Sequence, residues 1–424
     1  MNFIYDLYHK VSKWGIVKKF AKIYRNGFFV SNILAYKRAK HVVELQKREK
    51  KDKICVVFLC QYTQSWSKIS PVYEQMKSDS RFETYIVTVY DDVCGFKEED
   101  TFNYISNLGY DNIVRTIDST HIYDIKELNP QYVFYQRPYD RYLPEEYRSN
   151  IVSKYAKIAY ISYGYILTKD AVDMCMAKLF FRNVYLFFAE NKINCEYNIN
   201  RLKYSHKKGY RKSLNIGYPA FEDFMKYKNS RVEAEDVRLL WTPRWSDDKE
   251  VGGSNFLVFK DEIVKLVEKE NGISVIFRPH PLTFAHFISE NKMTKEEADN
   301  YLNLYKNSEK LVYDDSKNYA KTFWNADILL TDPSSIIVDY FLTGKPIIYC
   351  DTGMKPDKVF EKMIEAMYVV KTWDEAKAVI KKLLEGKDEL RDLRKKRIIE
   401  IFGDNFDNIS KNIVDTIAND YFEK

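Results

Sequence analysis

Residues 328–351, ILLTDPSSIIVDYFLTGKPIIYCD, decide the fold of the second half of this chain. The apolar run ILLT predicts a short strand, which Asp332 and Pro333 end. The apolar residues after Ser335 predict a helix that ends near Gly344, and Pro346 opens another strand-like run. This order of strand, loop, helix and strand is typical of a parallel α/β sheet.

Two interpretations of Ser334 and Ser335 are open. Both serines lie where the predicted helix begins, so their hydroxyls, the exposed N–H groups and the positive end of the helix would suit a phosphate. Serine is also a common helix cap, and without other residues the motif favours simple capping. The neighbouring strand ends supply those other residues.

The same alternation of short apolar runs and helical stretches extends back to Ile54. The first half contains ICVVFLC, TYIVTVY, QYVFYQ and KIAYISYGY, and the second contains RLLWTP, SVIFRPHP and KPIIYCD. Such continuous apolar strands predict parallel sheets covered on both faces. We therefore expect two doubly wound, Rossmann-like α/β domains. The expected divisions are a basic helical segment at 1–53, domains at 54–225 and 226–405, and a C-terminal helix at 406–424.

Polar loops follow several of these predicted strands, at the sheet edge where open parallel sheets bind ligands. His280 ends one strand between two prolines, which stiffen the loop, and Arg278 precedes it. A histidine in such a place is often structural, but the serine loop would line the same edge, so together they suit a diphosphate. The loops are Thr242-Pro243-Arg244-Trp245, Arg278-Pro279-His280-Pro281, Thr331-Asp332-Pro333-Ser334-Ser335 and, in the first half, Gln136-Arg137-Pro138-Tyr139-Asp140.

Length and composition exclude several classes of protein. The 424 residues are 45% hydrophobic and 30% charged, which is too apolar for a disordered chain. No uncharged apolar run is long enough to span a membrane, and the N-terminus lacks a signal-peptide pattern. The six cysteines are scattered without a CxxC pair, so neither zinc nor disulfides are indicated. We expect a cytoplasmic protein with no cofactor and no metal site.

The net charge of +6 comes from the N-terminus, because residues 1–53 carry +10 and the remainder carries −4. Apolar residues recur at helical spacing from Ile4 to Tyr24, with lysines between them. This pattern fits a helix lying on an anionic membrane surface, and equally a helix packed on the protein body. Nucleic acid is not an expected partner, since the rest of the chain is slightly acidic and lacks its motifs.

Four motifs in order resemble those of the CDP-glycerol glycerophosphotransferase family, the teichoic acid and capsule polymerases and primases. They are IGYPAFEDF, LLWTPRWSDD, RPHP and the serine loop with its following KPIIYC. The resemblance covers roughly residues 54–415 and is strongest in the second half. It implies a GT-B architecture, two Rossmann-like domains facing a central cleft, and peripheral attachment to the inner face of the cell membrane.

The resemblance also implies roles for individual residues. The second domain would bind the CDP-activated donor, with Arg278 and His280 on its pyrophosphate and Ser334 and Ser335 on its phosphates. Asp339 would contact the ribose. Thr242 and Arg244 would line the same pocket.

The first domain would bind the acceptor, and there the sequence departs from the family. The resemblance implies that the histidine of the family's HGTPLK motif is the general base. That motif aligns with Ser162 to Leu167, which puts Tyr163 in place of the histidine. Asp140 is the preferred base, because a carboxylate is already charged near neutrality; Tyr163 is second. Either residue has a simpler interpretation: Asp140 orients Arg137, or Tyr163 only packs. Gln136, Arg137 and Tyr165 are the expected acceptor contacts.

The predicted activity is attack by an acceptor hydroxyl on the β-phosphorus of CDP-glycerol or another CDP-polyol, which releases CMP. The acceptor would be a membrane-linked glycan or polyol phosphate. No acidic cluster suggests a divalent ion, so His280, Arg278 and the serine loop would stabilise the charge. Two alternatives stay open: a GT-B glycosyltransferase that uses a nucleotide sugar, and a non-catalytic partner in cell-surface polymer synthesis.

Overall fold

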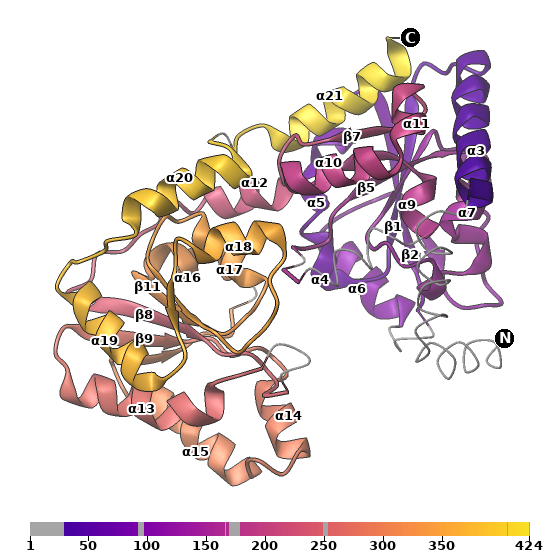
Figure 1. The fold of residues 1–424 in the computed structure, drawn as a ribbon. Helices are drawn as coiled ribbons and strands as arrows, with labels where there is room; N and C mark the ends of the chain where they lie inside the picture. The colour runs from indigo at the N-terminus through magenta and orange to yellow at the C-terminus, as the bar shows by residue number, and fades with distance from the viewer. Residues whose placement is uncertain are drawn as a thin grey trace, which may run out of the picture. The chain divides into compact units, whose positions relative to one another are not determined.

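The computed structural model describes residues 29–91, 97–165, 167–168, 179–248, 253–316, 318–404 and 406–423. The chain divides into two compact units, and each is described by itself (Figure 1). The first unit comprises Met1–Gly164, Asp173–Ala220 and Asn408–Lys424, and the second comprises Tyr165–Val172 and Phe221–Asp407. The chain therefore contributes Tyr165–Val172 to the second unit, enters it again after Ala220 and returns to the first unit at Asn408.

The first unit contains a seven-stranded parallel sheet in the order β3-β2-β1-β4-β5-β6-β7. Every residue of ICVVFLC in β1 is buried, as expected for a strand covered on both faces. The strands are β1 (Ile54–Cys60), β2 (Phe82–Val89), β3 (Ile113–Thr116), β4 (Tyr132–Tyr135), β5 (Lys157–Ile161), β6 (Val184–Phe188) and β7 (Lys212–Leu214).

Helices surround this sheet, and two of them come from the ends of the described chain. They are α3 (Phe29–Arg48), α4 (Thr63–Trp66), α5 (Ser70–Lys77), α6 (Glu98–Asn107), α7 (Ser149–Val152), α9 (Leu179–Asn183), α10 (Lys192–Arg201), α11 (Lys203–Lys207) and α21 (Ile409–Phe422). Short 3-10 helices lie at Ile125–Leu128, Asp140–Tyr142 and Glu145–Tyr147. Helix α12 (Pro219–Met225) carries the chain from the first unit into the second.

Helix α3 packs on the protein body. Its Ala35, Val42 and Val43 are buried, and Gln46 donates to the carbonyl of Gln131 at 2.8 Å. Arg38 donates to the side chain of Asn183, in α9, at 2.6 Å. For this part of the basic segment, packing on the body is therefore what the structure shows. The helical pattern expected from Ile4 to Tyr24 lies outside the described residues.

The C-terminal helix α21 docks on the first sheet through a buried carboxylate. Asp420 forms ion pairs with Lys157 and Lys212, each at 2.6 Å, and accepts hydrogen bonds from Tyr132 at 2.7 Å and Tyr185 at 3.1 Å. Burial opposes the ionisation of Asp420, but the two ammonium groups outweigh it and hold its pKa well below the usual range. These contacts join β4, β5, β6, β7 and α21.

The second unit contains a six-stranded parallel sheet in the order β10-β9-β8-β11-β12-β13. The strands are β8 (Val237–Thr242), β9 (Ile273–Phe277), β10 (Leu311–Tyr313), β11 (Ile328–Thr331), β12 (Ile347–Cys350) and β13 (Tyr368–Val370). The helices are α13 (Phe256–Lys269), α14 (Thr283–Ser289), α15 (Lys295–Lys306), α16 (Ala320–Asn325), α17 (Ile336–Phe341), α18 (Lys358–Ile364), α19 (Trp373–Leu384) and α20 (Arg391–Phe402).

Both sheets are doubly wound, which confirms the predicted fold class. In the second sheet, β8, β9 and β10 run outward in one direction and β11, β12 and β13 in the other, so the strand order reverses between β8 and β11. In the first sheet the reversal lies between β1 and β4. Ligands bind at the carboxyl ends of the strands at such reversal points.

Among the described helices, none combines the length and the apolar character needed to cross a membrane.

Candidate functional site

A cavity of about 640 Å³ opens at the carboxyl edge of the second sheet, beside the reversal between β8 and β11. The loops after β8, β9, β10 and β11 form its walls. Its lining residues are Thr242, Pro243, Arg244, Trp245, Arg278, Pro279, His280, Pro281, Tyr313, Asp314, Asp315, Tyr319, Ser334, Ser335 and Ile336. The structure thus brings together six of the residues selected from the sequence: Thr242, Arg244, Arg278, His280, Ser334 and Ser335.

Asp332 holds two of these loops in place. Its carboxylate accepts hydrogen bonds from the backbone N–H groups of Arg244 at 2.9 Å and Asn255 at 3.1 Å, from the amide of Asn255 at 2.9 Å and from the hydroxyl of Ser254 at 3.1 Å. Burial raises its pKa, and these hydrogen bonds oppose that rise. The sequence analysis named Asp332 only as part of the loop and gave it no role, although only Pro333 separates it from the two serines.

Arg244 extends from the loop that Asp332 holds. One guanidinium nitrogen donates to the carbonyl of Pro333 at 2.6 Å, which brings the group to the serine loop. Its Nε is buried and has no hydrogen-bond partner among the described residues. Burial lowers the pKa of Arg244, although an arginine stays charged near neutrality. Arg244 is half-buried, and a partly desolvated cation with an unused donor favours an anionic ligand.

Arg278 is held at the next strand end along the sheet. It donates to Asp314 at 2.7 Å and to the carbonyl of Ser316 at 2.9 Å, and its guanidinium lies 5.4 Å from the ring centre of Tyr319. Asp314 follows β10, so its strand end is beside that of β9. The pairing fixes the direction of Arg278. Its charge is partly neutralised by Asp314, which makes Arg278 a weaker anion contact than Arg244.

His280 is fixed in one neutral form by its own loop. The N–H of Leu282 donates to Nδ1 of His280 at 3.2 Å, so the neutral ring carries its proton on Nε2. Burial lowers the pKa of His280, and the charge of Arg244 lowers it further. Near neutral pH, His280 is therefore an uncharged hydrogen-bond donor at the cavity wall.

The serines do not cap the helix that follows them. Helix α17 begins at Ile336, and Ser335 makes no side-chain hydrogen bond to its first turn. Ser334 is half-buried and Ser335 exposed, and both line the cavity. The helix is only six residues long, so its dipole adds little. The two hydroxyls, rather than the helix end, are the groups offered to a ligand.

Two of the residues predicted to contact the CDP-activated donor, Thr242 and Asp339, have buried side chains. Thr242 is buried and donates to the hydroxyl of Thr331 at 2.7 Å, which joins β8 and β11. Asp339 is also buried, does not line the cavity, and accepts a hydrogen bond from Tyr319 at 2.5 Å. Asp339 therefore orients Tyr319, which does line the cavity.

The first unit carries a second polar cluster at the carboxyl edge of its sheet. Arg137, after β4, donates to Asp91 at 2.9 Å and to Gln61 at 3.2 Å. The Arg137 guanidinium lies 3.4 Å from the ring centre of Tyr62, and its side chain is only 9% exposed. Arg137 thus pairs with Asp91, which the sequence analysis did not single out, and not with Asp140.

The other acceptor candidates have clear structural partners. Gln136 accepts hydrogen bonds from the N–H groups of Gln61 and Tyr62 and donates to the carbonyl of Tyr62. Asp140 accepts two hydrogen bonds from Ser149, both at 2.7 Å, and burial raises its pKa. Tyr165 belongs to the second unit, where its ring stacks on Phe221.

Tyr163, the second base candidate from the sequence, shares a hydrogen bond of 2.8 Å with the hydroxyl of Tyr139. The residue before it, Ser162, donates to the buried carboxylate of Glu190 at 2.5 Å. Asn194 donates to the other Glu190 oxygen at 2.6 Å, and burial raises the pKa of this carboxyl. Glu190 follows β6, so it supports the loop of Tyr163 from the neighbouring strand. The sequence analysis missed Glu190.

Two parallel doubly wound sheets with an anion-suited cavity at the reversal point define the class of GT-B proteins, and solved structures agree. UDP-GlcNAc 2-epimerase from Neisseria meningitidis, bound to UDP-GlcNAc, aligns over 87% of this chain and 100% of its own, with a TM-score of 0.60 and 12% identity. A variant of the wall teichoic acid polymerase TagF aligns over 96% of this chain and 98% of its own, with a TM-score of 0.57 and 15% identity.

The family follows from sequence. The model of the CDP-glycerol:poly(glycerophosphate) glycerophosphotransferase family matches residues 193–419, just over half of the chain. The chain therefore belongs to this family, which confirms the resemblance, and it is a CDP-glycerol glycerophosphotransferase-like enzyme. No curated protein matches it.

Within the described ranges, no group of three or more histidine, cysteine, aspartate or glutamate residues is arranged to hold a metal ion.

Proposed function

We propose that this enzyme transfers glycerol phosphate, or a related polyol phosphate, from its CDP-activated form to an acceptor hydroxyl and releases CMP. The acceptor is a membrane-linked glycan or polyol phosphate, as in the synthesis of teichoic acid and capsule polymers. The observation that carries this proposal is that Arg244, His280 and the two serine hydroxyls line one cavity at the strand reversal. That cavity suits the diphosphate of a CDP donor.

The reaction balances without a cofactor. The acceptor oxygen attacks the phosphorus that bears glycerol, the bond from that phosphorus to the bridging oxygen breaks, and CMP leaves with the bridging oxygen. In phosphoryl transfer the protein mainly aligns the groups and stabilises charge. Nε2–H of His280, the guanidinium of Arg244 and the hydroxyls of Ser334 and Ser335 are suited to the phosphate oxygens. Each such hydrogen-bond donor lowers the activation free energy by about 2 to 4 kcal/mol.

The acceptor proton needs a base, and we retain Asp140 ahead of Tyr163. Burial raises the pKa of Asp140, which makes its carboxylate a stronger base than an exposed one. Arg137 and the loop of Tyr163 lie at the same sheet edge and would contact an acceptor. The side chains of Gln136 and Tyr165 already have structural partners, so these residues would act indirectly. Gln136 would hold the loop after β4 in place, and Tyr165 would shape the start of the second unit.

The first alternative is a glycosyltransferase that uses a nucleotide sugar. It is favoured by the likeness to an epimerase bound to UDP-GlcNAc, whose TM-score of 0.60 is similar to the 0.57 of the TagF variant. Likeness at 12% identity concerns the fold, whereas membership of the family supports a CDP-polyol donor. The second alternative, a non-catalytic partner, is motivated by tyrosine at position 163.

A panel of donors tests the activity. The purified protein is incubated with a lipid-linked acceptor and either CDP-glycerol, CDP-ribitol, a UDP-sugar or a GDP-sugar, and nucleotide release is measured by chromatography. We expect CMP from a CDP-polyol and no acceptor-dependent turnover of the sugars. Transfer from a sugar nucleotide alone would reject the proposal. Absence of any turnover would favour the non-catalytic alternative.

We also propose that residues 1–28 attach the protein to the inner face of an anionic membrane. Their spacing of apolar residues and lysines supports this, whereas α3 is already packed on the first unit. A variant lacking residues 1–28 should keep its turnover of a soluble acceptor and lose sedimentation with vesicles that contain anionic lipid. Unchanged sedimentation of that variant would contradict this role.

A further inference from the structure

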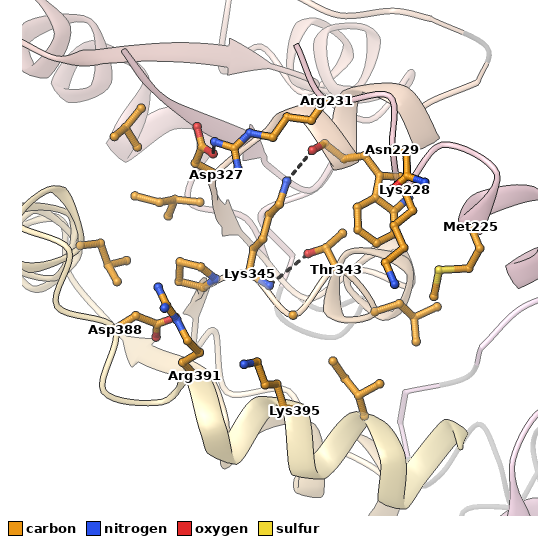
Figure 2. Close-up of a pocket in the computed structure, with 18 of the residues that line it drawn as sticks. Met225, Lys228, Asn229, Arg231, Asp327, Thr343, Lys345, Asp388, Arg391 and Lys395 are labelled. Carbon is orange, nitrogen blue, oxygen red and sulfur yellow. Dashed lines mark hydrogen bonds and ion pairs between the residues drawn. The ribbon is translucent and has the colours of Figure 1, made fainter. Parts of the chain in front are cut away.

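A second and larger cavity lies at the opposite edge of the second sheet. It has a volume of about 1050 Å³ and is lined by residues at the amino ends of β8, β11 and β12, among them Val237, Ile328 and Pro346. Helix α20 and the segment after α12 also contribute to its walls (Figure 2). The candidate active site lies at the carboxyl ends of the same strands, so the two cavities are distinct.

Three cationic side chains surround the open part of this cavity: Lys228, Arg391 and Lys395 (Figure 2). Arg231 also lines the cavity, but it is paired with Asp327 at 2.5 Å. Lys228 and Lys395 are exposed and form no ion pair with any described residue. Arg391 lies 3.8 Å from Asp388, whose carboxylate is already bound at 2.5 Å by the buried Arg394. These three cations are therefore available to an anionic ligand.

Lys345 has a different role, although it lines the same cavity. Its ammonium donates to the carbonyls of Trp324 at 2.5 Å and Ala326 at 2.6 Å, at the end of α16. Burial lowers the pKa of Lys345 to about 8. It caps a helix and is not counted among the ligand groups.

Carboxylates and apolar groups complete the lining, and they narrow the chemistry of the ligand. Glu235, Asp236, Asp404 and Asp407 line the cavity, together with Asp327 and Asp388, which are paired with Arg231 and Arg394. Leu342 and Ile398 are among the apolar lining residues. A purely anionic ligand would be repelled by those carboxylates. A ligand with both phosphates and hydroxyls matches the whole lining, because phosphates pair with the cations and hydroxyls donate to the carboxylates.

We propose that this cavity is an accessory site for a polyol-phosphate chain, the class of polymer that the proposed function, on which this inference rests, would produce. The methylene groups of such a chain suit the apolar part of the lining. The cations come from two separate segments, and the volume is at the upper limit for a single small ligand, so several repeat units fit better than one. The site retains the finished part of the polymer while its end is extended elsewhere.

Binding of synthetic glycerol-phosphate oligomers tests this site. The full-length protein and the variant Lys228→Ala/Lys395→Ala are titrated with a fluorescent oligomer of about eight units at low and moderate salt. Removal of two contacting charges should weaken binding about tenfold and flatten its dependence on salt. Lys396→Ala is the matched control, since Lys396 is an exposed lysine of α20 that does not line the cavity. Its affinity should equal that of the unmodified protein.

Equal affinity of the double variant and the unmodified protein would overturn the proposal. Two comparison ligands test the chemistry: an uncharged polyol oligomer should not bind, and linear polyphosphate of equal charge should bind more weakly. Polyphosphate binding as tight as that of the oligomer would overturn the assignment to polyol phosphates. Because these titrations need no turnover, they fail or succeed separately from the donor panel. Normal transfer without oligomer binding rejects only the accessory site.

Discussion

Replacement of His280 with alanine should lower the rate of glycerol-phosphate transfer by about 10² to 10³-fold, the cost of removing one preorganised donor at a reacting oxyanion. The reason is the position of Nε2–H, which the hydrogen bond from Leu282 to Nδ1 fixes at the cavity wall. The measurement is single-turnover transfer from CDP-glycerol. His280→Gln, whose amide can also donate, should recover part of the lost rate.

The pH dependence of this contribution follows from the lowered pKa of His280. A lowered pKa means that the ring is neutral at pH 7 and stays neutral at higher pH, so the difference in rate between the protein and His280→Ala should be constant above pH 7. His286→Ala is the matched control. His286 lies in the adjacent helix and contacts Trp245, but it does not line the cavity. An equal loss in both variants would contradict the role of His280.

Replacement of Asp420 with asparagine should destabilise the first unit by about 3 to 5 kcal/mol, since it leaves the buried ammonium of Lys157 without its counter-charge. The Lys157 side chain is only 4% exposed, so water cannot replace the carboxylate. The measurement is the free energy of unfolding, obtained by hydrogen exchange in urea from peptides of β4 and α21.

Asp415 provides the control, because it is a more exposed aspartate of the same helix, paired with Arg81 and Lys411. Asp415→Asn should cost less than about 1 kcal/mol. The pKa of Asp420 is lowered in the folded state, so its contribution is complete above about pH 4, the pKa of an unfolded aspartate, and is lost as the pH falls further. A loss below 1 kcal/mol for Asp420→Asn at pH 7 would contradict this account.

Much of the fold could be predicted from the central strands. Runs such as ICVVFLC and ILLT are buried on both faces, so their apolar character is continuous. The edge strands β3, β7, β10 and β13 were not predicted, because they have three or four residues and partly exposed side chains. The buried strand β6, VYLFF, carried the required signal and was overlooked.

The candidate site was predictable to the extent that its residues follow predicted strands. Thr242, His280 and Ser334 all do so, and the topology of parallel strands brings their loops together. Asp314 could not be placed, because it follows the short edge strand β10. Partners across loops, such as Asp91 for Arg137 and Glu190 for Ser162, depend on tertiary packing and leave no spacing pattern in the sequence.

A crystal structure with CDP-glycerol bound most directly tests whether the cavity in the second sheet is the donor site. We expect the diphosphate within hydrogen-bond distance of Nε2 of His280, the guanidinium of Arg244 and the hydroxyls of Ser334 and Ser335. Donor bound elsewhere on the protein, with this cavity empty, would contradict the account.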